Sequence, residues 1–418
     1  MLKDKKEVRE LFEYSLLKAM ARRRTRRFPL GCEMAEGTLA HTSKNPPVPL
    51  NDIETAILCW AGAGITGTIT GDMPTNDVQG GMWTSWTGRT TPYMCNVHNM
   101  KLLFTNDEGL FVYDPKGASK AVEIETEEDW EKIGTYFTRD TIKLSDGRFQ
   151  MIPDALVRGV HWNTNKPGTT IFMPIIELSE EFLNSLTTAF MGEGYKVFDD
   201  IKGQCPAGIK KWIDNGTLKG VEAPLSTLEH TIFVMNLAAP FHALQNMQLV
   251  AEAMGLGSII MTGYIGLIIL QNLGFRYNEA KEGSGAILNL NPVGLDGVFE
   301  SYQPPYYKTM DDAVDAFMEK RFGSNGILTS NYSGIVPYKD WKKVQPGYLV
   351  PSKQVIQIVK DYCNYIFDTF GRFPATLDTI VMPEWLQVHH LEEEFYDKYG
   401  MDKLLNETHR KHMELWHK

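Results

Sequence analysis

The chain has 418 residues, of which 43% are hydrophobic and 22% are charged, and these values exclude wholesale disorder and allow a sizeable buried core. Its length suits one elaborated domain rather than one minimal domain. Its formal net charge of -10 argues against a general nucleic-acid binder, because such proteins use an excess of positive charge to displace phosphate counterions.

Two helices are predicted near the start of the chain. The first lies within residues 1–28, where apolar side chains recur at helical spacing before a run of arginines. Prolines predict an irregular connection at residues 29–50. The second helix is expected at residues 53–63, with Asp52 as its cap.

Three strands are predicted in the next part of the chain. Residues 100–105 and 109–113 flank a polar turn, which predicts a β-hairpin. A third strand candidate covers residues 170–176. It lies within a part from about 120 to 235 that carries no motif we can assign, and we treat that part as an insertion.

Helical patterns return in the second half. Residues 241–254 have one apolar stripe that stops at a glycine pair, and residues 258–270 are expected to form a turn that leads into another apolar element. A Pro- and Tyr-rich segment at 302–307 precedes a helix predicted at 353–370, with Ser352 as its cap.

The last part of the chain is expected to be a solvated acidic tail. Residues 389–394 (HHLEEE) contain potential metal ligands. Consecutive histidines, however, would face different sides of a helix, and a solvated charged tail is the commoner reason for such a run. We therefore predict no bound metal.

Targeting and redox signals are weak. The N-terminal segment carries mixed charge and lacks the pattern of a signal peptide. Residues 259–273 are apolar but interrupted, and they fall short of the roughly 20 residues of a membrane span. The five cysteines show no close metal-type spacing, which is typical of reduced thiols and makes a structural zinc improbable. We expect a cytoplasmic protein without a membrane partner.

One basic cluster stands out from the acidic background. Arg22, Arg23, Arg24, Arg26 and Arg27 lie within six residues. Such a run is often a solvated face or a nuclear-localisation-like segment. The alternative is a phosphate clamp, because a guanidinium presents a planar fork of donors that matches phosphate oxygens.

The arginine cluster resembles a known signature. Residues 22–28 (RRRTRRF) are similar to the R-R-S-x-R-x-(F/Y) segment of the nitroreductase superfamily, in which cationic residues hold the phosphate of FMN. The resemblance implies that Arg22, Arg23, Arg24 and Arg26 bind FMN. Arg24 stands where the family usually has Ser.

A second segment supports the same resemblance. Residues 244–258 are similar to the family's Q-N-x-x-x-A-A-x-A-L-G-L-G-(S/T) helix and turn. Met261, Thr262 and Gly263 then align with a loop that lies against the flavin and offers a backbone N–H near its N5 atom. Such an approach needs small residues, and a donor near N5 tunes the redox chemistry of the flavin.

Further matches favour the azoline-dehydrogenase-like branch of the family. Residues 56–66, 88–92 and 109–115 resemble segments of that branch in the same order. Residues 93–96 (YMCN) replace its usual Ser/Ala/Gly run, which indicates a rebuilt pocket. Asn96 falls where related enzymes carry Asn, which implies a place near the flavin ring or ribityl chain.

The resemblance implies an α+β fold with a central, mainly antiparallel sheet flanked by helices, in an interlocked homodimer. It also implies an FMN-dependent oxidoreductase that acts on a small molecule, with NAD(P)H as a candidate reductant. We place an FMN-binding core at residues 1–280 and a C-terminal extension, a lid or dimer arm, at 281–418. No catalytic side chain is assigned.

Two other functions remain open on the sequence alone. The altered loop at 93–96 and the substitution at Arg24 are compatible with a nitroreductase-like pseudoenzyme, or a flavin-binding scaffold, that acts through a protein partner. A binder of nucleic acid or acidic partners would use the arginine cluster, but the net charge disfavours it.

Overall fold

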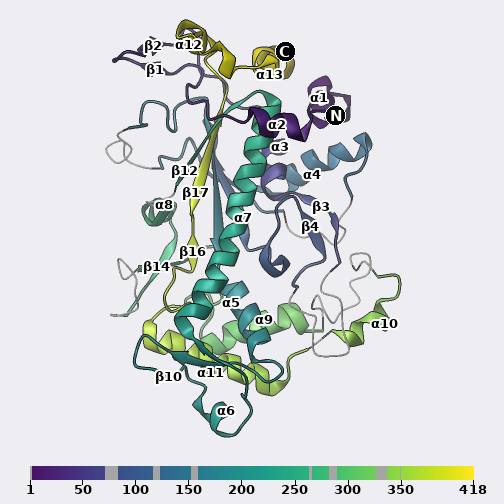
Figure 1. Cartoon of the computed structure of the whole chain (residues 1–418), viewed down its shortest axis with the longest axis vertical. Coiled ribbons are helices and arrows are strands. Elements are labelled where there is room, and N and C mark those ends of the chain that lie inside the picture. The colour runs from purple at the N-terminus through teal and green to yellow at the C-terminus, as the bar shows by residue number, and fades with distance from the viewer. Residues whose placement is uncertain are drawn as a thin grey trace.

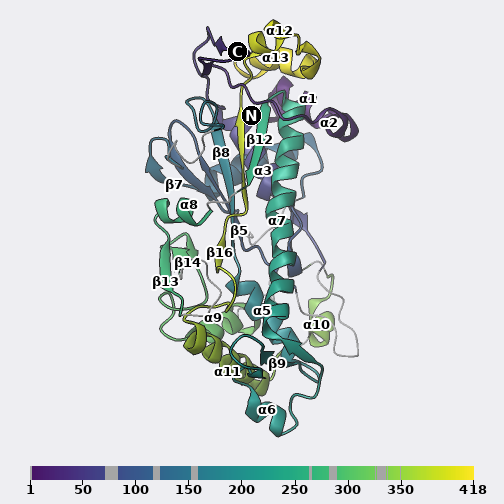
Figure 2. The same ribbon diagram turned by 60° about the vertical axis from the view of Figure 1, so that its left-hand side comes forward.

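The computed structural model of the chain describes residues 2–70, 83–115, 123–151, 159–262, 266–281, 290–324, 326, 336, 338–348 and 350–418. The molecule is elongated, with the main sheet in its upper half and a group of helices at its lower end (Figures 1 and 2). Among the described residues, no helix combines the length and apolarity that crossing a bilayer requires.

The centre of the fold is a seven-stranded sheet in which every described pairing is antiparallel. An α+β fold with a mainly antiparallel sheet is therefore confirmed. In spatial order the strands are β12 (Gly257–Thr262), β17 (Glu384–His389), β8 (Thr170–Glu177), β5 (Met100–Thr105), β6 (Gly109–Tyr113) and β7 (Thr141–Asp146), and β16 (Ile380–Val381) also pairs with β8.

Both faces of this sheet are covered. Strand β8 is buried along its whole length, and its successive side chains enter two different hydrophobic clusters. Phe172 packs towards the long helix α7, whereas Ile171 and Met173 pack towards the opposite side, because neighbouring side chains of a strand point to opposite faces. This explains why the strand has a continuous apolar sequence instead of an alternating one.

Helix α7 (Leu225–Met254) runs along most of the molecule and packs against α3 (Asp52–Ala63) (Figures 1 and 2). It ends at Gly255, whose φ of 92° favours glycine. The sequence predicts its C-terminal end correctly but misses its first half. Pro240 lies inside the helix, where proline normally interrupts the pattern.

Capping explains where other helices begin. Helix α3 starts with a capping box, in which the Asn51 side chain accepts from the Glu54 N–H and the Glu54 carboxylate accepts from the Asn51 N–H. The predicted cap at Asp52 is thus off by one residue. The Ser352 cap of α11 (Lys353–Phe370) is confirmed, because its hydroxyl accepts from the Val355 N–H.

Elements from both halves of the chain meet at the upper end, where the two ends of the chain lie (Figure 1). They are η1 (Leu2–Asp4), α1 (Lys6–Phe12), α2 (Leu16–Arg22), β1 (Glu33–Met34), β2 (His41–Thr42), α12 (Glu393–Lys398), η6 (Asp402–Leu404) and α13 (Glu407–Trp416). The lower end holds α5 (Ser179–Phe190), β9 (Lys196–Asp199), β10 (Cys205–Pro206), α6 (Lys210–Asp214), β11 (Glu222–Pro224), α9 (Met310–Phe322) and α11.

The remaining elements complete the described part of the chain. They are β3 (Ile65–Thr68), β4 (Thr87–Arg89), η2 (Met94–Asn96), η3 (Glu127–Trp130), α4 (Glu131–Asp140), α8 (Gly266–Asn272), β13 (Arg276–Glu279), β14 (Leu290–Leu295), β15 (Phe299–Glu300), α10 (Trp341–Val344) and η5 (Gln345–Gly347).

The sheet does not follow the expected division at residue 280. Strand β17 comes from the C-terminal part, yet it lies between β12 and β8 in the central sheet. The part from 120 to 235 likewise supplies β8 and the first turns of α7. Both parts therefore build the core, so that neither is simply an extension or an insertion added to it.

The prediction of a solvated tail at 389–394 is also wrong for the first half of that segment. His389 ends strand β17, and His390 and Glu392 are 2% and 0% exposed. These polar side chains are buried because the N-terminal segment covers them. The Leu30 N–H donates to the His390 carbonyl, and the Glu392 N–H donates to the Phe28 carbonyl.

Candidate functional site

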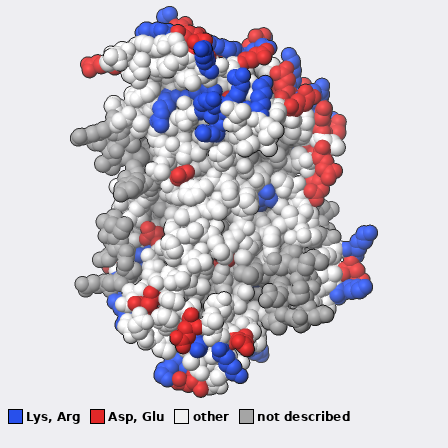
Figure 3. All heavy atoms as spheres, viewed as in Figure 1, with Lys and Arg blue, Asp and Glu red and all other residues white. Residues whose placement is uncertain are grey.

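The predicted phosphate clamp lies at the end of helix α2. Arg22 is the last residue of this helix, and Arg22, Arg24 and Arg27 are exposed while Arg23 is half-buried. In the described part of the chain none of these four side chains forms an ion pair with a carboxylate. Figure 3 shows basic side chains gathered over α2 and the segment after it. The cluster is therefore a concentrated positive patch that an anion can reach.

Arg26 differs from its neighbours, because it is only 2% exposed. Its guanidinium donates to the Glu252 carboxylate at 2.5 and 3.4 Å and to the Leu404 carbonyl at 2.7 Å. Glu252 also accepts from the Asn406 side chain at 3.0 Å. The charge of Arg26 is thus compensated within the chain, and its position fixes the arginine segment to α7 and to the cap of α13.

Asn96 lies at the end of η2, with a left-handed φ of 51°. Its side-chain amide donates to the carbonyls of Ser85 and Thr87 at 2.7 and 3.1 Å, and its side-chain oxygen accepts from the His98 ring at 2.9 Å. All these bonds stay within residues 84–98. In this structure the amide therefore holds its own loop together.

His98 continues this polar chain towards Arg89. Its Nδ1 atom accepts from the Arg89 guanidinium at 3.2 Å, so the ring donates to Asn96 through its other nitrogen. Burial and then the charge of Arg89 hold the pKa of His98 well below its usual range. The ring is consequently neutral near pH 7. The sequence offered no signal for this chain of contacts.

The loop predicted to face the flavin begins at the end of β12. Met261 is half-buried and pairs with Trp385, while Thr262 is exposed and pairs with Glu384. Gly263 lies outside the described residues. Thr262 is five residues from the start of β12, which corresponds to about 17 Å of strand.

The arginine segment and the end of the loop that contains Asn96 contact α7 at different turns. Arg26 donates to Glu252, whereas Asn99 donates to Asn236 at 2.9 Å. The sixteen-residue step from Asn236 to Glu252 corresponds to about 24 Å of helix. The earlier part of the loop lies nearer to the arginines, because the Asn246 amide donates to Thr90 and Thr91.

A polar pocket of about 380 Å³ lies beside the loop of Asn96. Its wall includes His98, Lys101, Asp114, Glu177 and Lys320, which come from widely separated segments. Burial raises the pKa of Glu177 to about 7. The volume is within the range of small-molecule sites, and the mixed charges suit a polar ligand. Sequence patterns missed this pocket because its wall combines the hairpin region at 98–114 with residues from 177–180, 297–307 and position 320.

No protein-family model matches the sequence, and neither does any curated protein. Among solved structures, the chain is similar to a presumed nitroreductase from Ralstonia eutropha JMP134, at 10% identity. The match covers 63% of this chain and 77% of that one, with a TM-score of 0.31. This score is too low to support an argument about fold or function, so the functional assignment depends on the residues themselves.

Proposed function

We propose that the chain is an FMN-dependent oxidoreductase of the nitroreductase type and works as a homodimer. The observation that carries this proposal is the arginine cluster, in which exposed guanidinium groups stand without acidic partners in the described part of the chain. The sequence around it resembles the FMN-phosphate signature of that superfamily. Planar guanidinium donors suit a phosphate dianion.

The cluster fits the phosphate end of FMN but with a changed set of residues. Arg22, Arg23 and Arg24 remain candidates for direct contact, and the exposed Arg27 joins them. Arg26 is better described as a positioning residue, because Glu252 already occupies its donors. The donor set is therefore cationic and accessible, as an oxyanion site requires.

The ring end of the flavin is supported less directly. The amide of Asn96 is engaged within its loop, so we do not assign it to the cofactor. Met261 and Thr262 remain candidates from the sequence resemblance. When bound, FMN would supply hydride or electron transfer to a small substrate, with NAD(P)H as a candidate reductant. The chain's own residues would hold the phosphate and position the ring.

The homodimer is supported by the outer face of α7. This helix of 30 residues contains only two charged side chains, Glu229 and Glu252, and both are buried. A solvated helix normally carries charges on its outer face. Its exposed side chains are Thr227, His230, Thr231, Val234, Met235, Phe241, His242 and Gln245.

The uncharged face continues beyond α7. Leu16, Leu17 and Met20 of α2 are 62%, 75% and 56% exposed, and α2 packs against α7. Figure 3 shows a broad area without charged side chains below the basic cluster. A second copy on this face would bury it and bring residues of another chain to the arginines. We expect an interface beyond roughly 2,000 Å² in total.

The clamp is tested by measuring FMN affinity of single variants by fluorescence titration. We expect Arg22→Ala and Arg24→Ala each to weaken binding by about 1.5–3 kcal/mol, as for lost hydrogen bonds to a charged group. Arg9→Ala is the matched control, because Arg9 is an exposed arginine of the same region that pairs with Glu127. Equal affinities of all three variants and the wild type would contradict the clamp.

A further inference from the structure

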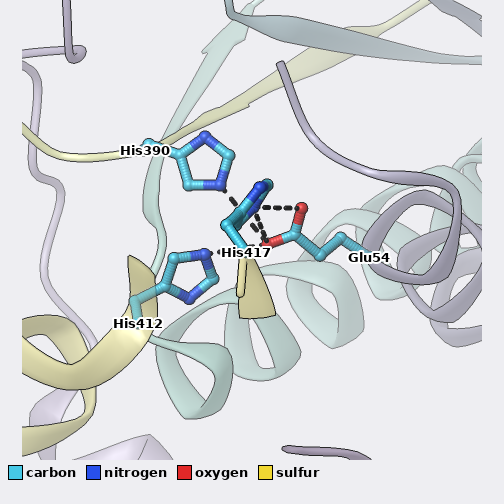
Figure 4. A group of neighbouring side chains, drawn as sticks. All are labelled: Glu54, His390, His412 and His417. Carbon is cyan, nitrogen blue, oxygen red and sulfur yellow. Dashed lines mark hydrogen bonds and ion pairs between the residues drawn. The ribbon is translucent and has the colours of Figure 1, made fainter. Parts of the chain in front are cut away.

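Four polar side chains from distant segments converge at the upper end of the molecule. Glu54 lies in the first turn of α3, His390 directly follows β17, His412 lies in α13 and His417 directly follows α13. Figure 4 shows the three rings turned towards the Glu54 carboxylate. One oxygen of Glu54, Oε1, lies 2.8 Å from Nε2 of His412 and 3.3 Å from Nε2 of His390 and of His417.

The cluster is closed to solvent on most sides. Glu54, His390 and His412 are 0%, 2% and 3% exposed, and the His417 side chain is 17% exposed. Each residue offers one possible ligand atom, a ring nitrogen or a carboxylate oxygen, and these four atoms lie within 4.8 Å of one another. Buried polar groups at this density need partners, because an unpaired one costs stability.

Backbone carbonyls fix which nitrogen of two rings carries hydrogen. Nδ1 of His390 lies 2.8 Å from the Val48 carbonyl oxygen, and Nδ1 of His412 lies 2.8 Å from the Met254 carbonyl oxygen. A carbonyl oxygen can only accept, so each Nδ1 donates. In a neutral ring Nε2 then carries a lone pair. Both Nε2 atoms lie beside the Glu54 carboxylate, which is also an acceptor.

This arrangement is typical of metal-binding histidines. Such residues donate their outer N–H to a carbonyl or carboxylate, which aims the other nitrogen at the ion. The carboxylate is oriented in the same way, because the second oxygen of Glu54 accepts from the Asn51 N–H at 2.7 Å. Each of these three side chains thus has a partner on its outer side.

The remaining explanation is that the rings are protonated and bond to Glu54 directly. Nε2 of His390 and of His417 are placed for such bonds to Glu54, at 3.3 and 3.2 Å. The contact of His412 speaks against it, because its Nε2 lies 2.8 Å from Oε1 of Glu54 without the alignment of a hydrogen bond. The rings of His390 and His412 lie 4.9 Å apart, so two cations would repel each other in a buried place.

We propose that Glu54, His390, His412 and His417 bind one divalent transition-metal ion, with Zn²⁺ as the reference ion. Three imidazoles and one carboxylate suit zinc and its neighbours in the first transition row. In a tetrahedral zinc site with bonds of about 2.0–2.1 Å, neighbouring ligand atoms are about 3.3 Å apart. Oε1 has this separation from Nε2 of His390 and of His417, and it lies at 2.8 Å from Nε2 of His412.

The ion would have a structural role, because four protein ligands fill a tetrahedral shell and leave no open position. It would join the start of α3, the end of β17 and helix α13. Asn406 caps helix α13 and also bonds to the Glu252 carboxylate beneath the arginine cluster. The site revises the sequence-based expectation of no metal. Its ligands come from three segments, so local spacing could not reveal it.

The test uses the full chain, stripped of metal with a chelator and then titrated with Zn²⁺ against a chromophoric competitor. We expect one Zn²⁺ per chain and a rise in the thermal midpoint when it binds. Co²⁺ at the same site should give the intense visible absorption of a four-coordinate ion. No binding at one equivalent, or a six-coordinate Co²⁺ spectrum, would overturn the proposal even without any variant.

Variants then locate the site. His417→Gln removes the most exposed ligand, and His161→Gln is the matched control, because His161 is an exposed histidine off the α7 face. We expect His417→Gln to weaken Zn²⁺ binding by at least about 100-fold, since loss of mere supporting contacts costs 10–100-fold. His161→Gln should bind as the wild type does. Undiminished binding by His417→Gln, or an equal loss in the control, would refute the assignment.

Discussion

Arg26 and Glu252 show how one residue of the arginine cluster has a different role from its neighbours. Both side chains are 2% exposed, so removing either one leaves a buried charge without its partner. We expect Arg26→Ala to lower the free energy of unfolding by about 3–5 kcal/mol. Urea denaturation followed by circular dichroism measures this loss.

Arg24→Ala is the control for that comparison, because Arg24 is exposed and, among the described residues, bonds only to nearby carbonyls. Its effect on stability should stay within about 0.5 kcal/mol. If Arg26→Ala proved as stable as Arg24→Ala, the ion pair with Glu252 would not hold the arginine segment in place.

Glu181 gives a prediction for the dependence of stability on pH. It is fully buried, it accepts from Asn184 and Ser185, and burial raises its pKa to about 7 from 4.5. The unfolded chain therefore releases this proton at lower pH than the folded chain does. The contribution of Glu181 to the free energy of unfolding is fully present below pH 4.5 and is lost as the pH rises to about 7.

The variant Glu181→Gln isolates this effect, because glutamine keeps the shape and has no proton to lose in this range. Between pH 4.5 and 7 the stability of the wild type relative to the variant should fall by up to about 3 kcal/mol. Urea titrations at several pH values measure the difference. A difference independent of pH would show that Glu181 is ionised in the folded chain.

At the level of elements, helix α7 makes the clearest prediction. If a second copy covers its outer face, Met235→Glu places a charge in an apolar interface. We expect the dimer to weaken at least 100-fold, or about 3 kcal/mol, because an unpaired buried charge is costly. Analytical ultracentrifugation measures the change.

Val221→Glu is the matched control for α7, because Val221 is 63% exposed and precedes β11, off the helix. This variant should remain dimeric. A monomeric wild type, or equal dissociation of both variants, would remove the support that α7 gives to the homodimer.

Elements with local signals could be predicted from the sequence. The bounds of β5, β6 and α11 agree with the predicted ones, because a hairpin turn and a serine cap are encoded by neighbouring residues. Strand β17 was missed, because it is stabilised by pairing with β12 and β8, which are distant in the sequence. The first half of α7 was missed because it continues through Pro240.

The candidate sites follow the same division. The arginine cluster could be proposed from sequence because its members are contiguous, but the partner of Arg26 lies 226 positions away. The cluster around Glu54 joins residues more than 300 positions apart. Contacts of such separation are set by packing of the whole chain and leave no periodic pattern.

For the whole molecule, the position of β17 decides how the C-terminal part should be described. A strand between β12 and β8 belongs to the core sheet, so the part after residue 280 is needed to complete that sheet. A role of this part as a lid over a substrate remains a proposal. The exposed arginines, the uncharged face of α7 and the polar pocket beside Asn96 are then features of one folded unit.

FMN binding by this chain is tested by the visible absorption spectrum of the purified protein. We expect a flavin spectrum that a chemical reductant bleaches, and release by denaturation of about one FMN per chain, identified by mass spectrometry. A colourless protein that also fails to take up added FMN would refute FMN binding.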